Sequence, residues 1–366
     1  NQGALLATNG GFFNLYGTYQ ADGGTMEGAV ALINGEVRVT RSTPAPTTIP
    51  LRGAVSLTTD NLTNAILWLQ GGGSGHGSLT APNSFVNRGI LRLQTISGGF
   101  NSDLVVSTGV LHNASSGVIE VNTGTGGPRN FTANLDNEGL LAVESGTGLY
   151  CHGAARIWNQ LGGAVNAQGA CTWADGPFNL SGGDITGTLY LRNATVDVAA
   201  TAVHSNTYIA TGSSPLLNNL SPQTTIWVCG GPYDHATFSA HTNGSLNLGT
   251  IRLESRNGGY TSALSVPGAG LTNGPTGVIS SEQGTGGPRW LSGALVNRGL
   301  VDATGFYLDL AGSIEEAGGR FEGSVRIRNS LLRVTASPAT PTTLLLWNVN
   351  TLASDNLTNV TLLVQG

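Results

Sequence analysis

Apolar and polar residues alternate along the chain in short bursts rather than in long periodic segments. Runs such as Leu104-Val105-Val106 and Gly117-Val118-Ile119 are separated by glycine, asparagine, serine, threonine and proline. Short β-branched runs between turn residues are typical of strands. No segment keeps the 3.6-residue spacing of apolar positions that marks an amphipathic helix. The pattern therefore predicts an all-β protein made of many short strands.

Internal repeats are the strongest signal in the sequence. The hexapeptide Gly-Thr-Gly-Gly-Pro-Arg occurs at residues 124–129 and again at residues 284–289. A longer signature, Gly-Gly followed by alternating apolar and polar residues, begins at Gly23, Gly182 and Gly318. Repetition of this kind indicates an architecture in which each unit packs on its neighbours.

The copies predict one continuous solenoid over residues 1–366, built from two blocks and part of a third. Block one spans residues 1–136, block two residues 137–296, and the partial block three residues 297–366. Block two is longer than block one, and the excess lies near residues 161–182. A solenoid accepts one additional coil because each coil contacts only its neighbours. This excess therefore predicts coils of about 23 residues, and about 16 coils in the chain.

Asparagine recurs about once per expected coil, although the steps between successive copies vary. Asparagine tolerates the left-handed backbone of tight turns, so it could simply mark turns. Stacked on successive coils, its amides could also hydrogen-bond along the axis, as in cross-β ladders. The asparagines assigned this structural role are Asn87, Asn113, Asn137, Asn159, Asn179, Asn247, Asn273 and Asn297. The predicted fold is a parallel β-helix, that is, a β-solenoid with coils of about 20–26 residues, a repeat length typical of solenoids.

The triplet Asn-x-Gly occurs at residues 1–3, 87–89, 137–139 and 297–299, and in most copies Leu or Ile follows it. This pattern resembles the repeats of filamentous-haemagglutinin-like proteins and autotransporter passengers of bacteria. The resemblance implies a right-handed β-helix on the outside of a cell, involved in adhesion or matrix formation. The coils expected here vary more in length than those repeats often do.

Composition narrows the range of partners. Charged residues make up 10% of the chain, the net charge is −5, and the chain contains 16 basic residues, all of them arginine. Nucleic acid binding depends on neutralising phosphates, so no nucleic acid partner is expected. The longest apolar run, near residues 344–347, is far shorter than the roughly 20 residues that span a bilayer. No membrane span is expected in this segment.

No catalytic, metal-binding or cofactor-binding set emerges from the sequence, and no cofactor is expected. Glycoside cleavage needs two carboxylates that flank one bond. The adjacent Glu315 and Glu316 would point to opposite faces of a strand, and we interpret them as solvated turn charges. The histidines lie too far apart for a typical metal motif. They are His76, His112, His152, His204, His235 and His241.

The cysteines and the hexapeptide arginines leave alternatives open. Cys151 and Cys171 are separated by nearly one expected coil, and stacked positions on adjacent coils, about 4.8 Å apart, are within disulfide range. A cross-coil disulfide is one interpretation; small buried hydrophobic residues are the other, also for Cys229. Arg129 and Arg289 are expected to close a tight turn and cross a neighbouring coil, with a sugar contact as the alternative.

These observations favour a structural or adhesive extracellular fibre or surface protein, built from tandem β-solenoid blocks and without enzymatic activity. Subunits would associate end to end, or the same chain would continue into a fibre, and surface glycans are candidate partners. The alternative is a carbohydrate-binding or carbohydrate-cleaving β-helix, such as a lyase or a tailspike-like protein. That alternative predicts a groove lined by carboxylates and aromatic rings.

Overall fold

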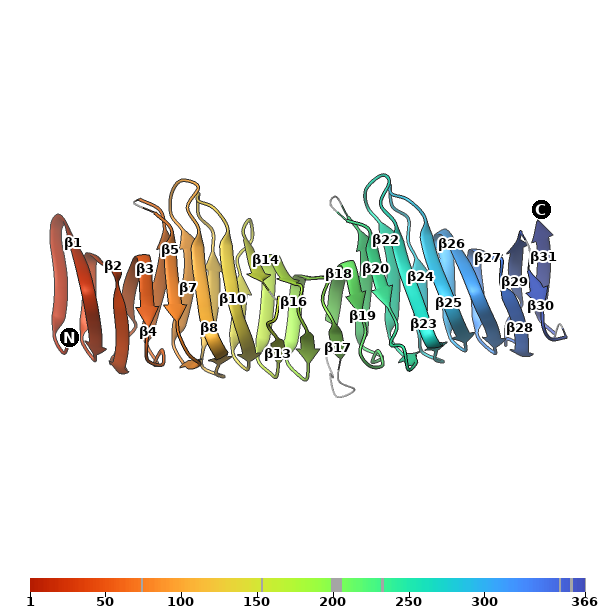
Figure 1. Cartoon of the computed structure of the whole chain (residues 1–366), viewed down its shortest axis with the longest axis horizontal. Coiled ribbons are helices and arrows are strands. Elements are labelled where there is room, and N and C mark those ends of the chain that lie inside the picture. The colour runs from red at the N-terminus through yellow and green to blue at the C-terminus, as the bar shows by residue number, and fades with distance from the viewer. Residues whose placement is uncertain are drawn as a thin grey trace. The chain divides into compact units, whose positions relative to one another are not determined.

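The chain is an all-β parallel β-solenoid of about 16 turns, with roughly 21 residues in each turn (Figure 1). The computed structural model describes residues 1–73, 75–152, 154–198, 206–231, 234–348, 350–355 and 358–365. Within these residues all secondary structure is β-strand, and no helix is present. The predicted fold class and number of turns are confirmed.

The chain divides into two compact units, Asn1–Leu189 (unit 1) and Tyr190–Gly366 (unit 2), and each is described by itself. The strands of unit 1 are β1 (Ala4–Asp22), β2 (Thr25–Arg41), β3 (Thr47–Leu57), β4 (Ala65–Gly71), β5 (Gly77–Ala81), β6 (Phe85–Asn87), β7 (Ile90–Thr95), β8 (Ser102–Asn113), β9 (Val118–Asn122), β10 (Arg129–Asn137), β11 (Leu140–Val143), β12 (Gly148–His152), β13 (Trp158–Gln160), β14 (Ala164–Ala174) and β15 (Phe178–Leu180). The unit boundary falls within β16 (Asp184–Arg192).

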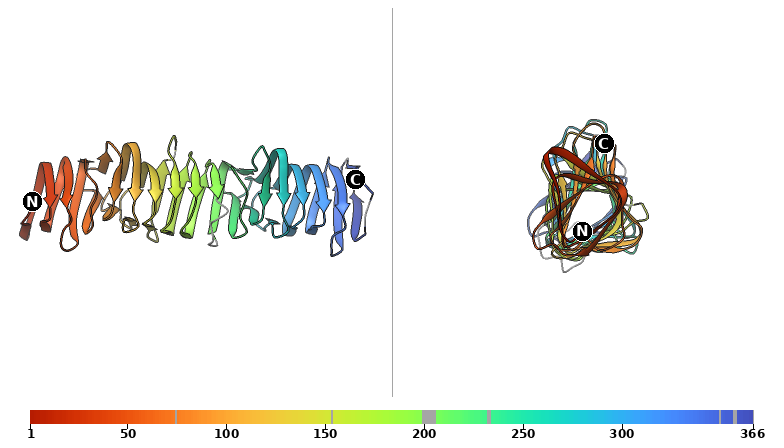
Figure 2. Two further views of the ribbon diagram at one scale, coloured as in Figure 1. Left: turned by 90° about the horizontal axis from the view of Figure 1, so that it is seen from below. Right: turned by 90° about the vertical axis from the view of Figure 1, so that its left-hand side faces the viewer.

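The strands of unit 2 follow the same parallel pattern. They are β17 (Val196–Val198), β18 (Asn206–Pro215), β19 (Thr224–Gly230), β20 (Ala236–Ser239), β21 (Ser245–Asn247), β22 (Thr250–Ser255), β23 (Ser262–Asn273), β24 (Val278–Ser281), β25 (Arg289–Asn297), β26 (Leu300–Ala317), β27 (Arg320–Arg328), β28 (Leu331–Ala336), β29 (Thr342–Trp347), β30 (Thr351–Leu352) and β31 (Val360–Gln365). Successive turns of the ribbon can be followed in Figure 2.

A turn has three strand-bearing sides, which we call sides A, B and C. In unit 1, side A stacks β7, β9 and β11. Side B stacks the first parts of β8 and β10 with β12, and side C stacks the last parts of β8 and β10 with β13. The rest of each turn serves as the crossover that parallel strands require.

Alternation of side chains across the strands fills the interior. In β10 every second residue is buried, as a strand with one face inward requires. Leu79, Leu104, Phe131, Cys151 and Trp173 pair in sequence on side B, and all five are fully buried. Burying a large apolar side chain contributes about 1.5–3 kcal/mol, so columns of this kind hold neighbouring turns together.

The additional residues of block two form one complete turn. The start of β14 pairs with β11 on side A, its end pairs with β12 on side B, and β15 pairs with β13 on side C. Three aromatic side chains pack inside it: Trp158 lies 5.7 Å from Trp173 and 5.4 Å from Phe178, both edge to face. This is the favoured geometry for aromatic pairs.

The three signature copies place an asparagine at the same kind of turn. Asn34, Asn193 and Asn329 have φ angles of 49°, 50° and 47°, a left-handed geometry that asparagine adopts more readily than most residues. The Oδ1 atom of Asn34 accepts the backbone N–H of Ala54, and that of Asn193 accepts the N–H of Ser213, each over 2.9 Å. These two asparagines therefore fix their turns by linking each one to the next coil.

Candidate functional site: polar ladders and an arginine–aromatic surface

A row of buried amides runs along side C of unit 1. Asn61 Nδ2 donates to Asn87 Oδ1 over 2.7 Å, Asn87 donates to Asn113 over 2.8 Å, and Asn113 donates to Asn137 over 2.7 Å. The same Nδ2 groups also donate to backbone carbonyls of the next turn, as Asn87 does to Val118 O over 3.2 Å. All four asparagines are fully buried. We call this row, which ends at Gln160 Oε1 2.9 Å from Asn137 Nδ2, the unit 1 ladder.

Unit 2 carries a matching row, the unit 2 ladder. Asn247 Nδ2 donates to Asn273 Oδ1 over 2.8 Å, and Asn273 donates to Asn297 over 2.9 Å. Asn297 then donates to a carboxyl oxygen of Glu316 over 3.1 Å. Glu316 is fully buried, so the expectation that it is a solvated turn charge is wrong. Burial raises the pKa of Glu316 to about 7, against the lowering effect of the Asn297 hydrogen bond.

Two of the expected ladder residues lie elsewhere. The register opposite Asn137 is occupied by Gln160, and Asn159 pairs with Asp136 on the outward side of the strand. Asn159 Nδ2 donates to Asp136 Oδ1 over 2.7 Å, and Asn179 Nδ2 donates to Asn159 Oδ1 over 2.8 Å. Asn159 and Asn179 thus belong to a second, partly exposed row. A shift of one residue moves a side chain to the other face of a strand.

The glycine of the Asn-x-Gly triplet has a steric cause. A Cβ atom on Gly139 would overlap the backbone oxygens of Gly117 and Ala114 in the preceding turn. A Cβ on Gly299 would overlap the oxygens of Gly274 and Gly277 in the same way. Only glycine lets the backbones of two turns approach this closely at the corner beside the ladder.

The hexapeptide arginines close their own loops. Arg129 donates from Nη1 to Gly127 O over 3.1 Å and from Nη2 to Asn122 O over 3.0 Å. Arg289 repeats this with Gly287 O over 2.6 Å and Glu282 O over 2.9 Å. Both are buried, and desolvation lowers the pKa of each. Arg289 also crosses to a neighbouring turn, as expected, because its guanidinium lies 4.1 Å from the centre of the Phe306 ring.

The cysteines are free thiols, which differs from the cross-coil disulfide considered above. Cys151 pairs in register with Trp173, whereas Cys171 pairs with Leu149, so the two are offset by two residues. Burial, followed by the proximity of Cys171, raises the pKa of the Cys151 thiol. Burial also raises the pKa of Cys229 to about 11. Thiols in such surroundings are inert core residues.

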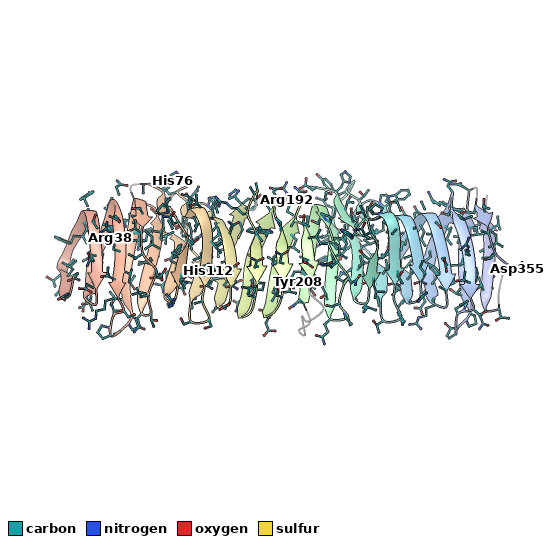
Figure 3. The ribbon with its side chains drawn as sticks, turned by 60° about the horizontal axis from the view of Figure 1, so that its bottom comes forward. Arg38, His76, His112, Arg192, Tyr208 and Asp355 are labelled. Carbon is teal, nitrogen blue, oxygen red and sulfur yellow. The ribbon has the colours of Figure 1, made fainter. Side chains whose placement is uncertain are left out.

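Two histidines cap equivalent loops in the two units. His76 Nδ1 accepts the backbone N–H of Asn101 over 2.9 Å and packs edge-on to Phe100 (Figure 3). His235 Nδ1 accepts the N–H of Thr261 over 3.0 Å and packs in the same way on Tyr260. His204 lies outside the described residues. In the part of the chain that the structure describes, no group of three or more metal-ligating side chains gathers.

The most concentrated surface chemistry lies on unit 2, where arginines stack on aromatic rings. We call this the arginine–aromatic surface. It comprises Trp227, Arg252, Arg256, Arg289, Phe306, Tyr307, Arg326, Arg328 and Trp347, with the acids Glu254, Glu282 and Asp309. It follows the bend in β26: residues 300–303 pair with the start of β27 before the bend, and residues 308–310 pair with the rest of β27 after it, where Asp309 also pairs with Trp290 of β25.

Each ring of this surface contacts a guanidinium group. Arg252 lies 4.5 Å and Arg256 5.3 Å from the centre of the Trp227 ring. Arg326 lies 3.6 Å from the Tyr307 ring and 4.9 Å from the Trp347 ring. Such cation–π contacts contribute about 0.5–2 kcal/mol and fix the orientation of the guanidinium plane.

A nearly buried carboxylate anchors the centre of the surface. Asp309 accepts two hydrogen bonds from Arg326, over 2.6 Å to Nε and 2.8 Å to Nη2. The Nε atom of Arg328 lies 3.1 Å from Asp309 Oδ1, without the alignment of a hydrogen bond. The bidentate pair leaves Arg326 with little capacity to bind another anion, whereas the terminal nitrogens of Arg328 have no such partner within the described residues.

Sequence reasoning missed the arginine–aromatic surface because its members come from six different turns. The tryptophans look scattered along the chain, and only the register of parallel strands brings them beside arginines. One signal was present: Trp68 and Trp227 occupy equivalent positions, and each is followed one turn later by an arginine, Arg92 or Arg252.

Comparison with known proteins adds no relative to this description. No family model, no curated protein and no solved structure matches the chain. Among the residues that the structure describes, no helix long and apolar enough to cross a membrane is found. The fold and its ladders therefore define the class of the protein, a parallel β-solenoid with buried amide ladders.

Proposed function

We propose that the chain is a structural or adhesive protein of a cell surface, built from tandem solenoid blocks and without an enzymatic role. The observation that carries this proposal is the use of buried polar side chains to join one turn to the next. In both ladders each asparagine amide donates to the following turn. Hydrogen-bonded buried networks rigidify a fold, which is what a load-resistant scaffold requires.

The extracellular location and the mode of assembly belong to the same proposal. The Asn-x-Gly triplets resemble those of filamentous-haemagglutinin-like and autotransporter-passenger repeats, whose place is outside the bacterial cell. A solenoid presents unpaired strand edges wherever its stack of turns stops. Contacts between such edges, or continuation of one chain, would extend the stack into a fibre.

The test combines stability, adhesion and turnover. The purified chain is heated, exposed to proteases, attached to beads to measure adhesion to cell and matrix surfaces, and incubated with a panel of polysaccharides. We expect resistance to heat and proteases, retention of the beads on at least one surface, and no release of new sugar ends. Robust cleavage that disappears on substitution of a single carboxylate would overturn the proposal and favour a lyase-like β-helix.

A further inference from the structure

We propose that the arginine–aromatic surface of unit 2 binds acidic polysaccharides through their carboxylate or sulfate groups. This inference names the ligand class for the adhesive role and therefore rests on the proposed function. Guanidinium groups match the planar, two-oxygen geometry of such anions. The rings beside them hold the guanidinium planes in place before a ligand arrives, which reduces the entropy lost on binding.

The contacts of the surface follow one another across successive turns. Trp227 contacts Arg252, whose Nη2 lies 2.5 Å from Glu254 Oε2. Further along, Arg289 contacts Phe306, and the Phe306 and Tyr307 rings lie 4.4 Å apart. Arg326 then joins Tyr307 to Trp347. Turns repeat at about 4.8 Å, so the line follows the solenoid axis as an extended polymer would.

Two arginines on this line retain free hydrogen-bonding capacity. Arg252 and Arg326 are paired with carboxylates, and Arg289 is buried against loop carbonyls. Arg256 is exposed and contacts Trp227, and Arg328 lies 4.5 Å from the Trp347 ring with 22% of its side chain exposed. Within the described residues, the terminal nitrogens of Arg256 and Arg328 hydrogen-bond to no protein group, so they are the groups that would bind an anion.

The charge of the surface is opposite to that of the chain. Five arginines stand against three acids, a net of +2, whereas the whole chain carries −5. The equivalent coils of unit 1 lack this arrangement: the repeat alignment puts Ile96 where unit 2 has Arg256, and Ile33 where it has Arg328. The blocks share a fold, so the fold does not require these two arginines, and their positive charge is a property of unit 2 alone among the compared positions.

A polysaccharide fits the surface better than a nucleic acid does. Affinity for nucleic acid depends on the neutralisation of many closely spaced phosphates, whereas this surface carries five arginines, of which Arg252 and Arg326 already pair with carboxylates. The faces of the rings are taken by guanidinium groups, so they do not offer open platforms on which bases could stack. Widely spaced acidic groups on a sugar polymer match two separate anion-binding positions.

The experiment measures binding of the whole chain to four immobilised polymers: polygalacturonate, which carries carboxylates, dextran sulfate, neutral dextran and single-stranded oligothymidine. We expect binding to one or both acidic polysaccharides and none to neutral dextran. The two acidic arms show whether carboxylate or sulfate is preferred. Stronger binding of oligothymidine than of either polysaccharide would overturn the inference.

The deciding variant is Arg256→Gln with Arg328→Gln. Charge-assisted bonds to two arginines are removed, so affinity for the acidic polymer should fall by about tenfold or more. The matched control is Arg298→Gln with Arg333→Gln, which changes the charge of the same unit equally at exposed positions off the surface. Arg298 lines a hollow of about 220 Å³ that shares no residue with the arginine–aromatic surface.

The control also tests the competing site. Equal loss of affinity in both double variants, or loss only in the control, would overturn the inference. Both variants should keep a cooperative thermal transition and the β-sheet circular dichroism of the parent chain, which shows that they fold, although loss of the two cation–π contacts lowers the midpoint of the Arg256→Gln, Arg328→Gln variant. Adhesion without binding to acidic polymers would refute the ligand assignment and leave the proposed function standing, whereas cleavage of a polymer would refute the function itself.

Discussion

The two ladders are built alike but end differently. The unit 1 ladder ends at Gln160, whose own Nε2 donates onward to Gly162 O over 2.5 Å. The unit 2 ladder ends at Glu316, whose Oε2 accepts from Asn297, while no hydrogen bond to its buried Oε1 is found among the described residues. A carboxylate cannot pass a hydrogen bond onward, and a buried carboxylate is costly to ionise. One terminal residue therefore decides whether a ladder responds to pH.

The outer surfaces of the two units also differ at equivalent positions. In unit 1, Arg52 donates to Gln70 Oε1 over 2.7 Å, and in unit 2 the equivalent Trp347 donates to Gln365 Oε1 over 2.8 Å. The residue one turn before is Ile33 in unit 1 and Arg328 in unit 2. The same cross-turn bond is thus kept while the exposed chemistry changes, which shows that the scaffold and its surface vary independently.

The largest expected effect separates the buried ladder from the outer row. Asn113→Ala would leave one N–H of the Asn87 amide and the Oδ1 atom of Asn137 buried without their ladder partners, at a cost of about 2–5 kcal/mol in the free energy of unfolding. Asn159→Ala removes contacts from a partly exposed row and should cost less than about 1 kcal/mol. Denaturant unfolding followed by circular dichroism measures both. Equal losses would show that the buried ladder has no special role.

The next effect concerns the ladder ends. The folded-state pKa of Glu316 is raised from 4.5 to about 7, so the folded state binds the proton more tightly than the unfolded state. Its contribution to stability is complete below about pH 4.5 and is lost as pH rises through about 7. Glu316→Gln should therefore stabilise unit 2 by up to about 3 kcal/mol at pH 8 and have almost no effect at pH 4.

Hydrogen exchange of peptides around residues 297–320 at several pH values would measure this difference. Gln160→Glu provides the reciprocal test, because it should give the unit 1 ladder the same kind of pH dependence. If Glu316→Gln leaves the pH profile of exchange unchanged, the carboxyl group is not the source of the difference between the ladders.

The smallest effect compares the two hexapeptide arginines. Both close a loop, but of the two, within the part of the chain that the structure describes, Arg289 alone also lies over an aromatic ring, that of Phe306. Lysine would lose the two-pronged contacts at either position, and at Arg289 it would also weaken the cation–π contact. Arg289→Lys should therefore lower the free energy of unfolding by about 1 kcal/mol more than Arg129→Lys does, as measured by thermal or denaturant unfolding of both variants. Phe306→Leu should remove this excess.

The fold could be predicted because the repeats in the sequence reveal the length of a coil. The residues of the candidate site could not be predicted in the same way, because their positions depend on the register in which the strands of successive turns pair. Asn113 and Asn137 follow from spacing, whereas Asn159 misses the ladder by one residue because the turn after Asn137 returns to the row at Gln160. Gln160 and Glu316 are not asparagines, so a search for that residue could not find the ladder ends. The disulfide considered from the spacing of Cys151 and Cys171 is absent for the same reason, because the residue that pairs with Cys151 in the next turn is Trp173.

The amide rows also have a direction. Every asparagine in the unit 1 ladder donates toward the C-terminal side, and the Oδ1 atom of Asn61, at its start, accepts from no group that the structure describes. The last folded asparagine of the ladder has an amide N–H that needs an acceptor from the next turn. A new turn that folds out of register would place an apolar group or another donor beside this N–H. Each completed turn would then act as a template that accepts only a correctly threaded successor, so the solenoid could correct errors as it grows.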